Sequence, residues 1–216
     1  MAVEQYAQWW HNRSLDSPHQ ELYDKTIALI PGLNSRSLVA DFGSASCVFA
    51  AKLVERGVKQ IAAIDSLVEA HDLAEQYLAE QGTSYSRNTI EKDAKINLLQ
   101  GDINRTQLPS ERYSHVTYLL PSITSEPSED ALKDLVQEWG IEHLMRQGAP
   151  LDILKSAFVN ASIRDVYRNA HNALQEGGHF VFVQYTMFPR SAEEKATIDL
   201  STSALITIGH PDDPRW

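Results

Sequence analysis

Three aspartates, Asp41, Asp65 and Asp102, each lie at the end of a short apolar run. A carboxylate next to buried apolar residues costs free energy unless a partner uses it. One such acid is common in proteins, but three at equivalent places form a pattern. Carboxylate oxygens accept hydrogen bonds from hydroxyl and amino groups. The pattern therefore indicates a binding site for a polar ligand.

The apolar runs are predicted to be buried strands, and amphipathic segments between them are predicted to be helices. The expected strands are 37–43, 61–65, 96–99, 115–120, 179–185 and one further strand at 204–208. The expected helices are 19–30, 45–56, 68–81, 130–147 and 151–175. Residues 83–94 are expected to be a loop or a frayed extension. Strand alternating with helix predicts an α/β, Rossmann-like, doubly wound and mostly parallel sheet. Ligands of such sheets bind at the carboxyl ends of the strands, where the aspartates lie.

The segments around the aspartates resemble motifs of the class I S-adenosylmethionine (SAM) dependent methyltransferases. VADFGSASC (39–47) is similar to their first strand and glycine-rich loop, and AAIDS (62–66) to their second strand. LLQGDI (98–103) is similar to their third strand, and ALQEGGHFVFV (173–183) to the helix, turn and fifth strand. The resemblance implies the class I methyltransferase fold with a helical insertion after the fourth strand, SAM as cofactor, and methyl transfer. The loop departs from the family pattern because GSASC has one glycine instead of two or three.

The same resemblance implies which residues would hold the cofactor. Asp65 would accept hydrogen bonds from the ribose hydroxyls and Asp102 from the adenine amino group. Gly43 would let the backbone approach the ligand where a Cβ atom would clash. The expected cofactor-binding residues, including apolar side chains to flank the adenine, are Asp41, Phe42, Gly43, Ser44, Ala45, Asp65, Ser66, Leu67, Asp102, Ile103 and Leu120.

Substrate contacts are expected from the aromatic N-terminal segment and from the insertion. Trp9 and Trp10 could cage a sulfonium cation or an apolar acceptor, and Trp139 could face the same site. Alternatively, these side chains pack on the core or form a dimer contact. Methyl transfer depends mainly on alignment and needs a base only where the acceptor must lose a proton. The candidate bases are His11, His143 and Tyr185.

The composition limits the classes of partner that the protein is expected to bind. The net charge of −10, from 29 acidic and 19 basic residues, disfavours nucleic acid and anionic membrane surfaces. The single cysteine, Cys47, allows no intrachain disulfide. No apolar stretch approaches the roughly 20 residues of a membrane helix, and no histidine and cysteine cluster has metal-ligand spacing. We expect a cytoplasmic protein without stable membrane insertion or a metal site, with a small-molecule substrate; a homodimer is left open.

The whole chain, 1–216, is expected to form one methyltransferase-like domain. Its expected parts are N-terminal cap helices in 1–34, a SAM-binding half in 35–121, an insertion and candidate substrate lid in 122–155, and a C-terminal half in 156–216.

Several functions remain open on this sequence. The first hypothesis is a SAM-dependent methyltransferase acting on oxygen or nitrogen of a small molecule. The second is a catalytically inactive, methyltransferase-like binding or partner subunit, which the single-glycine loop favours. A SAM-binding enzyme with non-methylating chemistry is a third. Residues 166–188 also resemble bacterial phospholipid N-methyltransferases, although the acidic charge argues against that role. A nicotinamide-binding Rossmann domain would require G-x-G-x-x-G after the first strand, which is absent.

Overall fold

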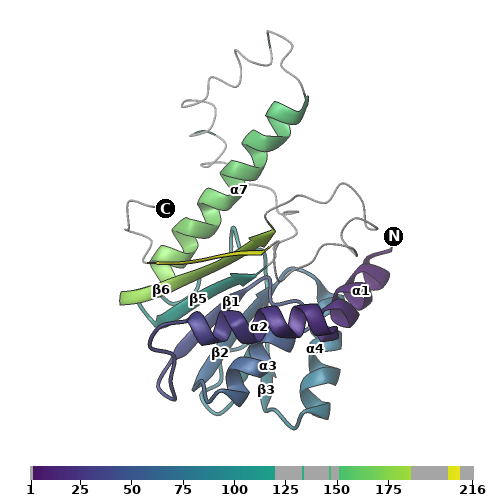
Figure 1. The fold of residues 1–216 in the computed structure, drawn as a ribbon, viewed down its shortest axis with the longest axis vertical. Helices are drawn as coiled ribbons and strands as arrows, with labels where there is room; N and C mark the ends of the chain where they lie inside the picture. Colours follow the sequence, from purple (N-terminus) through teal and green to yellow (C-terminus); the bar gives the residue numbers. More distant parts are fainter. Residues whose placement is uncertain (1, 120–132, 134–145, 147–150, 186–203, 210–216) are drawn as a thin grey trace.

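The computed structural model describes residues 2–119, 133, 146, 151–185 and 204–209 (Figure 1). For residues 151–161, 185, 204 and 205 the description covers the backbone alone. The predicted helix at 130–147 and nearly all of the predicted lid at 122–155 lie outside these residues. The division of the chain into cap, halves and lid stays a prediction.

A seven-stranded sheet in the order β3-β4-β2-β1-β5-β6-β7 forms the centre of the described structure. Its strands are β1 (Leu38–Phe42), β2 (Gln60–Asp65), β3 (Tyr85–Arg87), β4 (Ile96–Gln100), β5 (Tyr113–Leu119), β6 (Leu174–Tyr185) and β7 (Ala204–Gly209). All neighbours pair in parallel except β6 and β7, which are antiparallel. The chain runs from β1 outward to β2 and β4, then crosses to β5 on the other side of β1. The predicted doubly wound, mostly parallel sheet is therefore confirmed, with its switch point between β1 and β5.

Helices cover both faces of this sheet. They are α1 (Val3–Leu15), α2 (Ser17–Leu29), α3 (Val48–Glu55), α4 (Val68–Glu80) and α7 (Leu151–Ala173). In Figure 1, α2, α3 and α4 lie on one side of the sheet and α7 on the other. One apolar cluster joins α2, α3 and α4 to the sheet, and a second joins α7 to it. None of the helices in the described part of the chain is long and apolar enough to cross a membrane.

The side chains of β1 contribute to both apolar clusters. Successive side chains of a strand point to opposite faces. Val39 belongs to the cluster that includes α2, α3 and α4, whereas Ala40 and Phe42 belong to the cluster beside α7. Asp41, two residues after Val39, therefore faces the layer formed by α1, α2, α3 and α4.

The turn between α1 and α2 is fixed by Asp16. Its carboxylate accepts a hydrogen bond from the backbone N–H of His19 at 3.1 Å and so caps the start of α2. The other carboxylate oxygen lies 2.9 Å from the guanidinium of Arg13, in the last turn of α1. Since capping satisfies a backbone donor that the helix leaves unpaired, Asp16 both ends α1 and begins α2. This places α1 against α4, α2 and α3.

Three sequence-based boundaries were wrong. The expected loop at 83–94 contains β3, which pairs in parallel with β4. The helix expected from residue 45 begins at Val48, because Ala45 and Cys47 have positive φ angles of 46° and 60°. The fifth expected strand begins earlier, at Leu174, directly after α7. The strand expected at 204–208 is confirmed as β7.

Candidate functional site

The loop between β1 and α3 folds over the carboxyl end of β2. Gly43 has a φ of +65°, and a Cβ atom there would lie 3.4 Å from the ring of Tyr118. The N–H of Ser44 donates to the carbonyl of Ile64 at 3.0 Å. Left-handed backbone at Ala45 and Cys47 is unfavourable by roughly 1–2 kcal/mol per residue. The single-glycine loop therefore depends on its hydrogen bonds to β2 for its shape.

Asp65, the last residue of β2, supplies the main anchor of that loop. One carboxylate oxygen accepts from the N–H of Ala45 and the other from the N–H of Leu67, both at 2.9 Å. Burial raises the pKa of the Asp65 carboxyl, while the hydrogen bonds from Leu67 and Ala45 oppose that rise. A carboxylate has about four lone-pair sites, so Asp65 retains capacity for a ligand.

Asp41 is the more deeply buried acid, with 3% of its surface exposed. The hydroxyl of Thr117 on β5 donates to its carboxylate at 2.6 Å. Burial raises the pKa of Asp41 to about 7, helped by the nearby charge of Asp65 and opposed by the hydrogen bond from Thr117. Near neutral pH, Asp41 is therefore balanced between its neutral and ionised forms.

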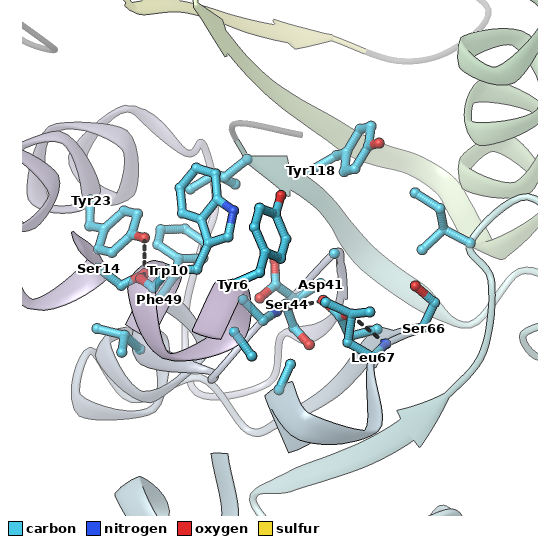
Figure 2. A pocket seen from close by; sticks show the side chains of 18 residues that line it. Tyr6, Trp10, Ser14, Tyr23, Asp41, Ser44, Phe49, Ser66, Leu67 and Tyr118 are labelled. Carbon is cyan, nitrogen blue, oxygen red and sulfur yellow. Dashed lines mark hydrogen bonds between the residues drawn. The ribbon is translucent and has the colours of Figure 1, made fainter. Parts of the chain in front are cut away.

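These residues line a cavity of about 120 Å³ beneath α1. It includes many of the predicted residues, namely Trp10, Asp41, Gly43, Ser44, Ala45, Asp65, Ser66, Leu67 and Ile103. Its wall also contains Tyr6, Ala7, Ser14, Tyr23, Val48, Phe49, Ala70, Tyr118 and Leu119. Figure 2 shows Tyr6 and Trp10 directed from α1 into the space beside Asp41 and Ser44, with Tyr118 across from them.

Two of the predicted cofactor residues lie elsewhere. Phe42 is buried in the apolar cluster beside α7, because it points to the face of the sheet opposite Asp41. Asp102 lines an adjoining depression of about 630 Å³, which shares Ser66 with the cavity. The carboxylate of Asp102 accepts a hydrogen bond from the N–H of Asn104 at 2.9 Å. A ligand that reached Asp102 from the cavity would pass Ser66.

Two predicted residues on α1 do not line the cavity. The ring of Trp9 packs edge-on against Trp10, with 5.0 Å between centroids. The Nδ1 atom of His11 lies 2.9 Å from the hydroxyl of Ser46, and its ring lies edge-on to Tyr77 on α4 at 5.8 Å. This geometry gives no support to His11 as a base or to Trp9 as a substrate contact.

The remaining predicted residues cannot be placed. Leu120, Trp139 and His143 lie outside the described residues, and Tyr185 is described by its backbone alone.

Sequence reasoning missed most of the aromatic wall. Tyr6, Trp10 and Ser14 stand four residues apart, so they share one face of a helix. Cap helices were predicted in 1–34 with bounds only for 19–30, and a helix at 3–15 with this spacing would have singled out Tyr6. No comparable signal marks Tyr23 or Phe49, whose rings meet at 5.2 Å only through the packing of α2 on α3.

The sheet order, the loop after β1 and the acid at the end of β2 define the fold of the class I SAM-dependent methyltransferases. Several solved structures share it. One is a complex of the Haloferax volcanii methyltransferase activator Trm112 with a candidate methyltransferase (13% identity, TM-score 0.54, 84% of this chain and 59% of that chain covered). Another is geranyl diphosphate methyltransferase in complex with SAM (10% identity, TM-score 0.53, 80% and 51% covered). A third is a candidate sarcosine dimethylglycine methyltransferase from Galdieria sulphuraria (14% identity, TM-score 0.50, 77% and 46% covered).

These likenesses establish the fold. The chain spans about half the length of the solved structures that it matches. No family model matches the sequence, and no curated protein matches it.

Proposed function

We propose that this chain binds SAM in the cavity beneath α1 and transfers the methyl group to oxygen or nitrogen of a small molecule. One observation carries the proposal. Asp41, Ser44 and Asp65 line the same cavity, at the switch point of the sheet. In sheets of this kind, ligands bind at that point. The fold shared with solved methyltransferases supports the same assignment.

The polar atoms of the site fit SAM. The hydroxyl of Ser44 is buried, and within the described residues its side-chain neighbour for hydrogen bonding is the thiol of Cys47, a weak partner. Since buried polar atoms in proteins are almost always paired, this hydroxyl is suited to donate to the carboxylate of SAM. Asp65 has lone pairs left for two ribose hydroxyls. The depression beyond Ser66 would take the adenine, with Asp102 at its wall.

The contribution of the chain itself would be to position the cofactor and to exclude water from it. Bound SAM supplies a methyl group on a sulfonium, which becomes a neutral thioether when a nucleophile bonds to the methyl carbon. Ser44 would hold the carboxylate end of the cofactor and Asp65 its ribose, and Tyr6 and Trp10 would exclude water. Alignment of the reacting atoms supplies much of the rate in such a transfer.

The cavity must widen before it can hold SAM. Pockets for ligands of drug size measure about 300–1,000 Å³, against about 120 Å³ here. The N-terminal helix α1 carries four residues of the wall, namely Tyr6, Ala7, Trp10 and Ser14. We therefore expect α1 to shift when the cofactor binds. The indole of Trp10 would report that shift by a change in fluorescence.

The small cavity also favours a second candidate, a catalytically inactive methyltransferase-like subunit that acts through a partner. The matched Haloferax structure is itself a complex of a methyltransferase with an activator. The cytoplasmic location, the small-molecule substrate and a homodimer stay predictions.

Calorimetric titration with SAM and with its demethylated product, S-adenosylhomocysteine, tests the proposal. We expect micromolar binding by the wild type. Ser44→Ala removes a hydroxyl whose described side-chain neighbour is only the weakly bonding thiol of Cys47, so it should leave folding intact and weaken binding by roughly 1.5–3 kcal/mol, or 10- to 150-fold. Ser17→Ala is the control, because its hydroxyl lies 3.1 Å from the carboxylate of Glu21 on α2 and does not line the cavity. A folded wild type that binds neither ligand would favour the inactive subunit.

A further inference from the structure

The wall of the cavity combines aromatic rings with carboxyl groups. Five of its side chains are aromatic, namely Tyr6, Trp10, Tyr23, Phe49 and Tyr118. Two more are the carboxyls of Asp41 and Asp65. Of the described residues that line it, none is a lysine, an arginine or a histidine. A positive charge would therefore find charged partners in this cavity, whereas a negative charge would find only neutral donors, such as the hydroxyl of Ser44, among these side chains.

The basic side chains that α1 carries next to Trp10 are engaged elsewhere. The guanidinium of Arg13 lies 2.9 Å from the carboxylate of Asp16 and 5.9 Å from the ring centre of Trp9. His11 contacts Ser46 and Tyr77. Enclosing an anion without a counter-charge costs several kcal/mol or more. The cavity is thus unsuited to a carboxylate or phosphate group on the acceptor.

Trp10, Tyr23 and Phe49 form an aromatic recess between α1, α2 and α3, on the side away from Ser66 in Figure 2. The faces of aromatic rings carry partial negative charge and attract cations. If the cofactor lies along Ser44, Asp65 and Ser66, this recess is the part of the cavity left for a second ligand. The whole cavity, at about 120 Å³, is smaller than the roughly 150 Å³ that is sufficient for benzene. The recess must therefore widen with the rest of the cavity when α1 shifts, and it suits only a compact ligand.

We propose that the aromatic recess binds an organic cation, and that the methyl acceptor is a small amine rather than a carboxylate or a phosphate. The second half of this proposal, an amine as the methyl acceptor, rests on the proposed function, because methyl transfer also requires bound SAM as the donor. The first half, cation binding in the recess, stands on the wall itself.

Transfer to an amine balances with groups on the wall. A protonated amine must lose one proton before its lone pair can bond to the methyl carbon. The ionised carboxylate of Asp41 can take that proton and become neutral, while the electron pair of the broken S–C bond stays on sulfur. A cation held nearby favours the ionised form of Asp41 before the proton moves.

Three probes of one shape and different charge test the proposal: benzylamine, benzyl alcohol and benzoate. Each is titrated calorimetrically into the full chain, with and without saturating S-adenosylhomocysteine. We expect benzylamine to bind at least tenfold more tightly than benzoate. Trp10→Leu should weaken benzylamine about tenfold or more, since it removes a ring from the wall. Trp9→Leu is the control, because Trp9 neighbours Trp10 on α1 without lining the cavity. Asp41→Asn should reduce the preference for benzylamine while preserving shape.

The outcomes separate this proposal from the proposed function. Selective binding of benzylamine that Trp10→Leu loses and Trp9→Leu keeps would support the cationic recess. Benzoate binding as tightly as benzylamine would overturn it, and so would failure of all three probes to bind a protein that holds S-adenosylhomocysteine. A protein that selects benzylamine but binds neither SAM nor S-adenosylhomocysteine would support the recess and contradict the methyltransferase function.

Discussion

Asp41 makes the stability of the protein depend on pH in a way that one substitution should remove. Burial raises the pKa of its carboxyl from an ordinary 3.8 to about 7. Between these values the folded protein holds a proton that the unfolded chain has lost, so the free energy of unfolding falls as pH rises. A pKa difference of about three corresponds to about 4 kcal/mol lost by the time the pH exceeds 7. Below pH 3.8 this contribution is fully retained.

Asp41→Asn removes the charge and keeps an oxygen to accept from Thr117. Urea unfolding followed by circular dichroism, at pH 5 and at pH 8, gives the free energy of unfolding of both proteins. From pH 5 to pH 8 the wild type should lose about 3 kcal/mol relative to the variant. Taking the difference cancels the groups that the two proteins share.

Asp24→Asn is the control, since Asp24 is an exposed residue of α2 paired with Lys52 at 2.9 Å. It should leave the pH dependence of the wild type unchanged. A difference between wild type and Asp41→Asn that stays constant from pH 5 to pH 8 would refute the assignment of a raised pKa to Asp41.

Two further expectations concern the scaffold. Asp16→Ala should destabilise the protein by about 1–2 kcal/mol, because it removes the cap of α2 at His19; an unchanged urea midpoint would contradict that role. Gly178→Ala should reduce the thermal midpoint more than Gly177→Ala. A Cβ atom at Gly178 would lie 2.9 Å from the carbonyl oxygen of Gln175, whereas Gly177 faces open space and only its φ of +70° opposes a side chain. Equal thermal midpoints of the two variants in calorimetry would show that the structure relaxes around this contact without a loss of stability.

The fold could be predicted because its signals are local. Apolar runs of four to seven residues between helical segments identify buried parallel strands. An aspartate at the end of such a run marks the edge of the sheet at which ligands bind in folds of this kind. β3 was missed because three residues, Tyr85–Arg87, carry too little pattern, and its pairing with β4 is a tertiary contact. The late start of α3 follows from left-handed backbone at Ala45 and Cys47, which no propensity predicts for these residues.

The site was predicted only in part, for the same reason. Alternation along β1 places Phe42 opposite Asp41, so its absence from the cavity could have been read from the sequence. The contribution of Tyr23 could not, because it depends on how α2 packs on α3. Packing of the helices brings the aromatic side chains of the wall together. The order of the strands brings the aspartates together.

The contact between His11 and Ser46 links two parts of the site mechanically. α1 carries Tyr6 and Trp10 of the wall, and the same helix is joined through His11 to the loop that would hold the cofactor. Release of a ligand would then require α1 to move away from the loop, and that movement would break the contact between His11 and Ser46. In enzymes with such covers, opening often limits turnover. The residence time of the product would accordingly be governed by a contact between His11 and Ser46 that lies outside the cavity wall.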